Sequence, residues 1–339
     1  EGELIFRLVY DKAGCTKPFK RLWISSLEDS AIREGFNHLR DGKEYDRLYE
    51  AALSRSKADW IVGINGTRLF TTLYHKKLVV GRVQTPTLAM LVERDGKIST
   101  FHKEKYFNVH VGKGDLTADL EKVKTEEEAK RIAAACEKKQ AVVSSLKRET
   151  KTVNPPKLYD LTTLQREANR YYGFTAQQTL DLVQTLYEKK LLTYPRTDSQ
   201  FITDDMEDTA RQVISIICRQ FPLFSGVLVT PDIARVTDNG NVTDHHAILP
   251  TVQLEKQDVS VLPQSEQKIL NLVGMRLLCA TGEKHTYAET QISLSCESYT
   301  FKTKGKTVVQ NGWKAVEELF KASLKAKEKD DPVKSLPEV

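Results

Sequence analysis

Strand-like segments lie on both sides of a long, mainly helical block, and this order constrains the fold more than any other feature of the sequence. Residues 105–121 read as two strands around a Gly-Lys-Gly-Asp turn, and 140–153 read as a third. The apolar spacing is helical from 155 to 283, and a strand pattern returns at 291–313 around a Lys-Gly-Lys turn. We therefore predict an α+β chain in which a helical domain is inserted between two parts of a β-rich arm.

Helical signals dominate the first hundred residues. Residues 58–74 keep an apolar stripe at helical spacing, and 81–97 carry a specific start signal. There Thr85 is a candidate N-cap, Pro86 holds the first helical position, and Gly96 closes the end.

This start signal also predicts where an anion could lie. Arg82 and Gln84 are expected just outside the helix N-terminus, where unpaired backbone N–H groups and the helix dipole attract negative charge. The alternative is a surface loop that merely enters a helix.

Composition narrows the class of protein. With 339 residues the chain should hold two to four domains, and its formal charge of +5 is too mild to identify a nucleic-acid binder. The five cysteines are widely spaced without a C-x-x-C pair, which supports neither a disulfide framework nor a zinc ribbon. No P-loop pattern occurs, so phosphate chemistry need not consume a nucleotide.

The segment LLTYPRTDS, residues 191–199, is the first candidate for chemistry. A proline disfavours the helical region for the preceding residue, so Tyr194 should be extended, and residues two apart should face one side. The phenol of Tyr194 and the guanidinium of Arg196 would then lie over one spot, which suits a phosphate ester and transesterification through a phosphotyrosine. The structural alternative is a tyrosine packed under a turn.

A pair of histidines stands in TDHHAILPT, residues 243–251. Adjacent side chains point in different directions, so we expect one to enter a site and the other to pack or face water. An imidazole near a phosphate suits hydrogen bonding and proton relay. A metal site is disfavoured because no third His or Cys lies at ligand spacing.

Polar and basic side chains gather in two predicted helices. LTTLQREANRYYG (161–173) combines Thr163, Gln165 and Arg166 with aromatic residues, a mixture that suits single-stranded nucleic acid. Its alternative is an amphipathic helix with a buried aromatic face. LSRSKADW carries Arg55, which by itself could be part of an ordinary solvated face.

Six segments follow one another in a distinctive order: EGELIFR, RSKADWIVGINGTRLFT, GRVQTPTLAMLVERD, PPKLYDLTTLQREA, LLTYPRTDS and DHHAILPT. In this order they resemble the type IA DNA topoisomerases, and within them the topoisomerase III branch. The resemblance covers most of the chain. It implies an ATP-independent enzyme that nicks one DNA strand, holds the 5′ phosphate on a tyrosine, passes another strand and reseals the nick.

The resemblance also assigns roles to residues. Tyr194 matches the nucleophile, Arg196 the arginine that contacts the scissile phosphate, and His245 the active-site histidine. Glu1 matches the third acid of the Mg²⁺-binding motif D-x-D-x-R-E-G-E, whose two aspartates are not in the chain. The expected contacts with single-stranded DNA are Arg55, Arg82, Gln84, Thr163, Gln165 and Arg166. We therefore expect part of a longer enzyme, with an incomplete Mg²⁺ site and incomplete activity.

The implied fold is a fragment of a toroidal core, with a β-rich arch and an inserted, mainly helical domain that carries the catalytic tyrosine. Its expected parts are the tail of a TOPRIM-type metal-binding domain (1–40), a helical ring-base segment (41–100), the first part of the arch (101–154), the inserted domain (155–283) and the return of the arch (284–339). The resemblance further implies a monomer, a helicase as candidate partner, no membrane, and a cytoplasmic, nucleoid-associated location.

Two other functions stay open. A tyrosine recombinase or relaxase would need an arginine-rich constellation or a His-metal triad, and the sequence shows neither. A single-strand-binding module with an inert tyrosine is compatible with the residues. Covalent trapping on DNA would distinguish the three.

Overall fold

The computed structural model describes residues 2–24, 29–114, 116–227, 230–242 and 245–324. The chain divides into two compact units, Glu1–Ile24 with Ile32–Lys105 and Ser25–Ala31 with Tyr106–Val339. Helices, short 3₁₀ turns and an antiparallel sheet of five strands make the chain α+β, as the sequence predicted. Among the helices described, none is both long and apolar enough to cross a membrane.

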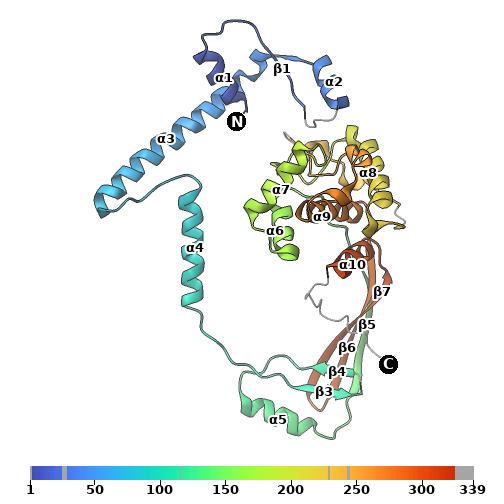
Figure 1. The fold of residues 1–339 in the computed structure, drawn as a ribbon. Helices are drawn as coiled ribbons and strands as arrows, with labels where there is room; N and C mark the ends of the chain where they lie inside the picture. The colour runs from blue at the N-terminus through green and yellow to red at the C-terminus, as the bar shows by residue number, and fades with distance from the viewer. Residues whose placement is uncertain (1, 25–28, 115, 228–229, 243–244, 325–339) are drawn as a thin grey trace. The chain divides into compact units, whose positions relative to one another are not determined.

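The part of the chain before Lys105 is mainly helical (Figure 1). Its elements are α1 (Gly2–Lys12), β1 (Lys20–Arg21), α2 (Asp29–Asn37), β2 (Arg40–Asp41), α3 (Asp46–Tyr74) and α4 (Gln84–Ser99). After α3 the chain reverses at His75, whose φ of 52° is left-handed. The connection then runs back along α3, where the Val80 N–H donates to Thr67 Oγ1 at 3.0 Å.

Helix α4 differs from its predicted limits at both ends. It begins at Gln84, and the Thr85 hydroxyl accepts from the Gly81 N–H at 3.1 Å instead of capping a later start. Pro86 is tolerated because the first turn has no intrahelical acceptors for its N–H groups. The helix also runs through Gly96 to Ser99. Gln84 is therefore the first residue of the helix, and the expectation that it lies outside was wrong.

The second unit contains a sheet in the order β3-β4-β7-β6-β5. Its strands are β3 (His110–Lys113), β4 (Leu116–Asp119), β5 (Val142–Val153), β6 (His285–Cys296) and β7 (Tyr299–Gln310), and α5 (Glu126–Cys136) packs on it. The Thr125 side chain caps α5 by accepting from the Glu128 N–H, and Ile132 joins Ile292 and Phe301 in a small core. The strand regions on both sides of the helical block are thus confirmed.

The turn between β6 and β7 lies elsewhere than the sequence predicted. Lys304, Gly305 and Lys306 are inside β7, with Gly305 opposite Thr290. The chain instead reverses just after Cys296, where Glu297 has a φ of 51°. A turn at Gly305 would leave much of the β7-facing edge of β6 without backbone partners. The turn after Cys296 allows a longer run of hydrogen bonds between β6 and β7, and this decides its position.

The helical block holds the larger core. Its helices are α6 (Leu161–Tyr172), α7 (Ala176–Glu188), α8 (Glu207–Gln220) and α9 (Gln264–Ala280), joined by 3₁₀ turns. Asp160 and Thr175 cap α6 and α7 with reciprocal hydrogen bonds, and Gly173 ends α6 at a φ of 71°. Helix α9 is apolar on most sides because it lies inside this core.

The block leaves the sheet after Val153 and returns at His285, and these two residues pair across β5 and β6. Within this unit, Figure 1 shows the block at one end of the long strands and α5 at the other. Helix α10 (Lys314–Ser323) follows β7 but packs into the helical core, where Phe320 contacts the Tyr171 ring at 5.4 Å. The last part of the chain therefore contributes to both the sheet and the block.

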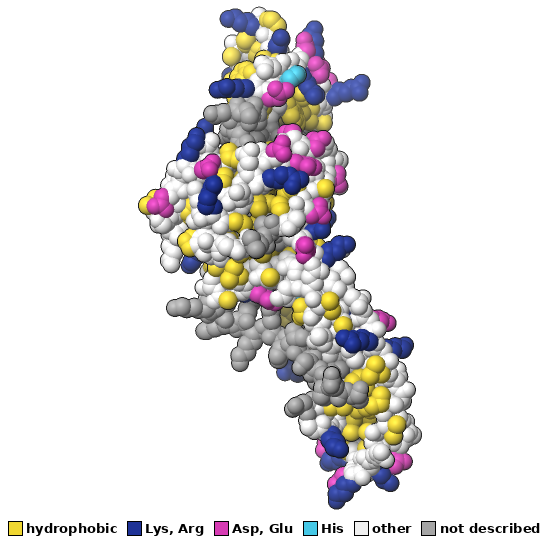
Figure 2. All heavy atoms as spheres, turned by 90° about the vertical axis from the view of Figure 1, so that its right-hand side faces the viewer, with side chains coloured by type: hydrophobic (Ala, Val, Ile, Leu, Met, Phe, Trp, Pro, Cys, Tyr) yellow, Lys and Arg dark blue, Asp and Glu magenta, His cyan; other side chains and the backbone are white. Residues whose placement is uncertain are grey.

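Charged side chains of both signs lie on the face drawn in Figure 2. On the face in Figure 2, Lys and Arg lie among Asp and Glu, in keeping with a formal charge of only +5. Any anion site on this face must therefore depend on a few local side chains.

Candidate active site

The segment that carries Tyr194 alternates between buried and less buried side chains and bends at Pro195. Side chains at the odd positions 193–199 are buried, whereas Tyr194 is half-buried and Arg196 and Asp198 are exposed. The alternation has a period of two residues, which puts Tyr194 and Arg196 on the less buried side of the segment, with the bend at Pro195 between them.

Two threonines fix this segment to the one that carries the histidines. The buried Thr193 hydroxyl donates to the Ala247 carbonyl at 3.1 Å and accepts from the Leu249 N–H at 2.9 Å. The Thr197 hydroxyl donates to the His245 carbonyl at 2.9 Å. Because these bonds bracket Tyr194 on both sides, the two segments position each other.

The structure brings Tyr194 and His245 together. Their ring centroids are 4.3 Å apart with an interplanar angle of 40°. His246 instead points into the core, and its Nδ1 lies 2.8 Å from the Ala247 carbonyl, to which it must donate. Burial lowers the pKa of His246. The two adjacent histidines therefore point in different directions, as the sequence predicted, and His246 is the one that packs.

A second aromatic ring lies against the tyrosine, and the sequence did not point to it. The Tyr187 ring, at the end of α7, meets the Tyr194 ring edge-on at 5.4 Å and 77°. Burial, and then the neighbouring Tyr194, raise the pKa of Tyr187. No local pattern signals this contact, since it depends on how α7 ends.

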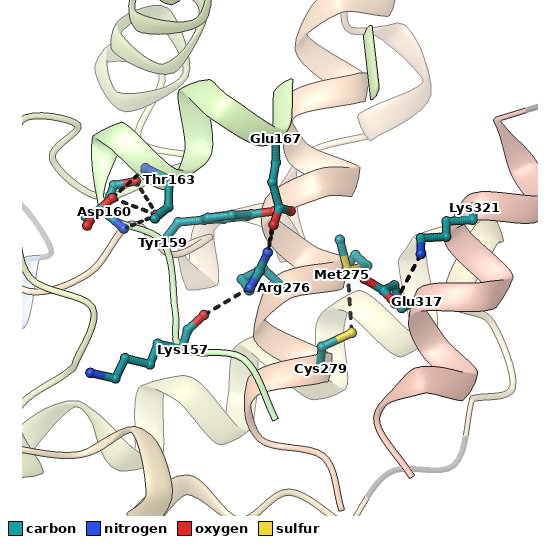
Figure 3. Close-up of polar contacts among 10 residues, drawn as sticks. All are labelled: Lys157, Tyr159, Asp160, Thr163, Glu167, Met275, Arg276, Cys279, Glu317 and Lys321. Carbon is teal, nitrogen blue, oxygen red and sulfur yellow. Dashed lines mark hydrogen bonds and ion pairs between the residues drawn. The ribbon is translucent and has the colours of Figure 1, made fainter. Parts of the chain in front are cut away.

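The start of α6 is tied to the tyrosine segment. The Leu161 N–H donates to the Thr197 carbonyl at 3.1 Å, and Gln200 Nε2 donates to Asp160 Oδ2 at 2.9 Å. Asp160 Oδ1 accepts from the Thr163 N–H at 2.6 Å (Figure 3). The start of helix α6 is therefore held against the segment that carries Tyr194, at Thr197 and Gln200.

The three candidate DNA contacts on α6 have different surroundings. Thr163 takes part in the cap, and Gln165 Nε2 donates to the Ala176 carbonyl at 3.0 Å. Arg166 is exposed. Contacts of Thr163 or Gln165 with DNA would have to coexist with these internal hydrogen bonds or replace them.

Arg55, Arg82 and Gln84 belong to the first unit, whereas Tyr194 belongs to the second. Arg82 pairs with Asp59 on α3, with Nε to Oδ1 at 2.8 Å, and its side chain is 59% exposed. Arg55 is exposed one helical turn before Asp59, so the two arginines lie near one stretch of α3. Gln84 follows as the first residue of α4.

A buried polar group under the site was also missed. Glu167 on α6 binds both the Tyr159 hydroxyl and Arg276 from α9, and the Arg276 guanidinium lies 4.4 Å over the Tyr159 ring (Figure 3). Although burial lowers the pKa of Arg276, its neighbours Tyr159 and Glu167 outweigh that effect and raise it. The Tyr159 carbonyl in turn accepts from the Ile248 N–H at 2.8 Å, which supports the histidine segment.

One signal could have revealed this group. Arg276 is the single charge in the apolar run NLVGMRLLCA of α9, and a buried arginine requires a partner.

The described residues do not by themselves fit a Mg²⁺ site. Glu1, the expected ligand, lies outside them, as does Asp244 next to the histidines. Among the described residues, no group of three or more His, Cys, Asp or Glu side chains could hold a metal ion. Glu3 is instead paired with Arg7 at 2.8 Å and with Arg21 at 2.7 Å.

Comparison with known proteins identifies the class to which this fold and site belong. Residues 43–339 match the family described as DNA topoisomerase, and the chain is a member of that family, of type IA. Its relatives include DNA topoisomerase 3 from Bacillus licheniformis, 39% identical over 99% of this chain and 48% of the relative. DNA topoisomerase 3 from Bacillus subtilis is 40% identical over 99% of this chain and 48% of that protein.

The fold is also similar to a solved structure. Full-length topoisomerase I from Thermotoga maritima aligns with a TM-score of 0.74 and 26% identity, covering 94% of this chain and 53% of that one. The predicted type IA core fold is thereby confirmed. The chain spans about half the length of the curated relatives it matches.

Proposed function

We propose that the whole protein is a topoisomerase III-like enzyme that cleaves one DNA strand through Tyr194, passes another strand through the break and reseals it. The observation that carries this proposal is the contact of the Tyr194 and His245 rings, at 4.3 Å, on two segments that fix each other. Membership in the family makes such a pair the candidate catalytic centre.

Cleavage is a transesterification. The Tyr194 phenol oxygen attacks a backbone phosphorus and loses its proton, and the bond from phosphorus to the 3′ oxygen breaks. The leaving 3′ oxygen takes up a proton, and the 5′ phosphate remains on the tyrosine. Because one phosphodiester replaces another, the freed 3′ hydroxyl can later reverse the step without ATP.

Arg196 and His245 have separate roles in this proposal. Arg196 is exposed on the same side as Tyr194, where its planar guanidinium can hold two phosphate oxygens and stabilise the charge that develops on them. His245, against the tyrosine ring, suits hydrogen bonding to the phosphate or proton transfer.

Single-stranded DNA is the proposed substrate. Arg55, Arg82 and Gln84 would guide the strand on the first unit, and Thr163, Gln165 and Arg166 would do so on α6. We also propose the division into a TOPRIM tail, ring base, arch and inserted domain, a monomeric enzyme in the cytoplasm, and a helicase partner. Mg²⁺ would need ligands beyond the described residues.

Covalent trapping tests the proposal. The full-length protein is incubated with a labelled single-stranded oligonucleotide, denatured, and digested so that the DNA-bearing peptide can be mapped. We expect the adduct on Tyr194 and none above background for Tyr194→Phe, whose ring still packs but lacks the nucleophile. Arg196→Lys should reduce the cleavage rate by about 10²- to 10³-fold, the cost of losing one positioned charge donor, and should affect strand binding less.

Each outcome separates the candidate functions. An adduct on another tyrosine would place the nucleophile elsewhere. Strand binding without any adduct would favour a single-strand-binding module. An adduct through a 3′ phosphate would favour a recombinase-type reaction.

A further inference from the structure

Two rings from different parts of the chain lie against the Tyr194 ring. The centroid of the His245 ring is 4.3 Å away, and that of the Tyr187 ring is 5.4 Å away in an edge-to-face arrangement. Hydrogen bonds fix the backbone of the segment on the histidine side. The orientation of the phenol about its own side-chain torsions depends on the rings beside it.

The end of α7 places Tyr187 there. The Lys190 N–H donates to the Tyr187 carbonyl at 2.8 Å, and the Leu191 N–H donates to the Leu186 carbonyl, also at 2.8 Å. With Lys190 left-handed at a φ of 59°, this is a Schellman-type end, which turns the chain sharply back past the last turn of the helix. Leu192 then pairs with Pro250, so the tyrosine segment passes beside Tyr187 in a fixed register.

We propose that Tyr187 is a positioning residue, whose ring holds the Tyr194 phenol in the orientation needed for attack on the phosphate. The proposal rests on the proposed function, since it requires Tyr194 to be the nucleophile. Edge-to-face rings attract one another beyond the effect of their buried area, which favours one side-chain orientation. The contact uses the ring and not the hydroxyl.

Two substitutions separate the ring from the hydroxyl. Tyr187→Ala removes the ring and should slow formation of the Tyr194 adduct by about 10- to 100-fold, because small errors in the position of a reacting group have effects of this size. Tyr187→Phe keeps the ring and should restore the rate to within about twofold of the wild type, since the edge contact is retained. Affinity for the uncleaved single strand should change little in both.

The rates are measured in a single turnover with the full-length protein, together with strand affinity by fluorescence anisotropy and thermal unfolding. Tyr299→Ala is the matched control, because Tyr299 is also half-buried but packs against the core of the sheet. If Tyr187→Ala cleaves like the wild type, or if the control slows cleavage as much, the positioning role is refuted. If Tyr187→Phe slows cleavage as much as Tyr187→Ala does, the positioning role of the ring is refuted and the hydroxyl is the group that matters.

The same experiment keeps the two proposals apart. If the wild type forms no adduct on Tyr194, the proposed function fails. If the wild type forms it and Tyr187→Ala forms it equally fast, only the inference about Tyr187 fails. Equal loss of strand affinity and cleavage in Tyr187→Ala would instead make Tyr187 a DNA contact.

Discussion

At the scale of single residues, the two adjacent histidines differ in what surrounds them. The His245 ring lies against Tyr194, whereas His246 is 1% exposed and donates from Nδ1 to the Ala247 carbonyl. Protonation of His246 would place a second N–H at Nε2, which has no hydrogen-bond partner in the described part of the chain. Its surroundings therefore favour a neutral, structural His246, and His245 is the histidine to which we assign a chemical role.

Mild acid should destabilise the protein through His246. Burial lowers its folded-state pKa, so the unfolded chain binds the proton more tightly. The stability that His246 contributes is complete above its unfolded pKa of about 6.5, and is lost as the pH falls from there through the lowered pKa. In His246→Asn, whose amide can still donate to Ala247 without titrating, the loss should be smaller by up to about 1.4 kcal/mol per pH unit.

Urea unfolding between about pH 7 and about pH 5 measures this difference, since single-proton linkage acts in that window. Tyr194 adduct formation by the variant serves as a control for an intact site. Parallel pH dependences for the two proteins would show that His246 has an ordinary pKa in the folded state.

Residue order and local chemistry were enough to find Tyr194, Arg196 and His245 as candidates. They were not enough to find Tyr187, which stands in the preceding helix and reaches the site only because of how that helix ends. The ion pair of Arg82 with Asp59 was likewise missed. Contacts between elements depend on their packing, which local sequence patterns do not encode.

At the scale of elements, the Thr193 hydroxyl is one of the groups that join the two segments of the candidate site. Thr193→Val keeps the shape of the side chain but leaves the Leu249 N–H without its partner, and the Ala247 carbonyl then accepts only from His246. The variant should lose about 1–3 kcal/mol of unfolding free energy, the cost of buried groups left unsatisfied. Urea unfolding curves check the loss, and Tyr194 adduct formation should fall with it.

Thr162→Val is the matched control, because Thr162 is exposed on α6. It should change stability by less than about 0.5 kcal/mol, as is usual for surface substitutions. If both variants unfold at the same urea concentration, the Thr193 hydroxyl does not join the two segments.

Elements with strong end signals could be predicted, and weak signals were misleading. The helix predicted at 161–173 matches α6, and the Gly-Lys-Gly-Asp turn gave the β3–β4 hairpin. Gly96 and Gly305 read locally as an end and a turn, yet both lie inside regular elements. A glycine permits a break in structure, but the hydrogen bonds on either side of it decide whether one occurs.

At the scale of the whole molecule, DNA binding should depend on a few local charges. If Arg55, Arg82 and Arg166 each contact a phosphate, the logarithm of single-strand affinity should fall with the logarithm of salt with a slope of roughly 2, at ~0.7 per contact. Single strands should bind more tightly than duplex, since stacking needs unpaired bases. Fluorescence anisotropy at several salt concentrations measures both.

Arg166→Ala should reduce the slope by ~0.7, because Arg166 is exposed on α6. Arg82 is a less direct test, because its substitution also breaks the ion pair with Asp59. Arg219→Ala is the control, since that exposed arginine is paired with Glu255 on the helical block. A slope unchanged by Arg166→Ala would remove α6 from the DNA path.

The helix predicted at 58–74 was found, but the burial of its apolar stripe could not be predicted from the sequence. The helix exists as part of α3, but α3 buries no residue, and Trp60 is 67% exposed. An apolar stripe predicts that one face of a helix favours burial, but it does not identify the element that would pack against that face.

The pairing of Val153 with His285 has a consequence for how the chain folds. The two strands are neighbours in the sheet although the whole helical block lies between them in sequence. In an unfolded chain, joining such distant residues costs the entropy of closing a long loop. Once the block has folded, its two ends lie next to each other. Strands β5 and β6 can then pair residue by residue from these ends, as the strands of a hairpin do from their turn.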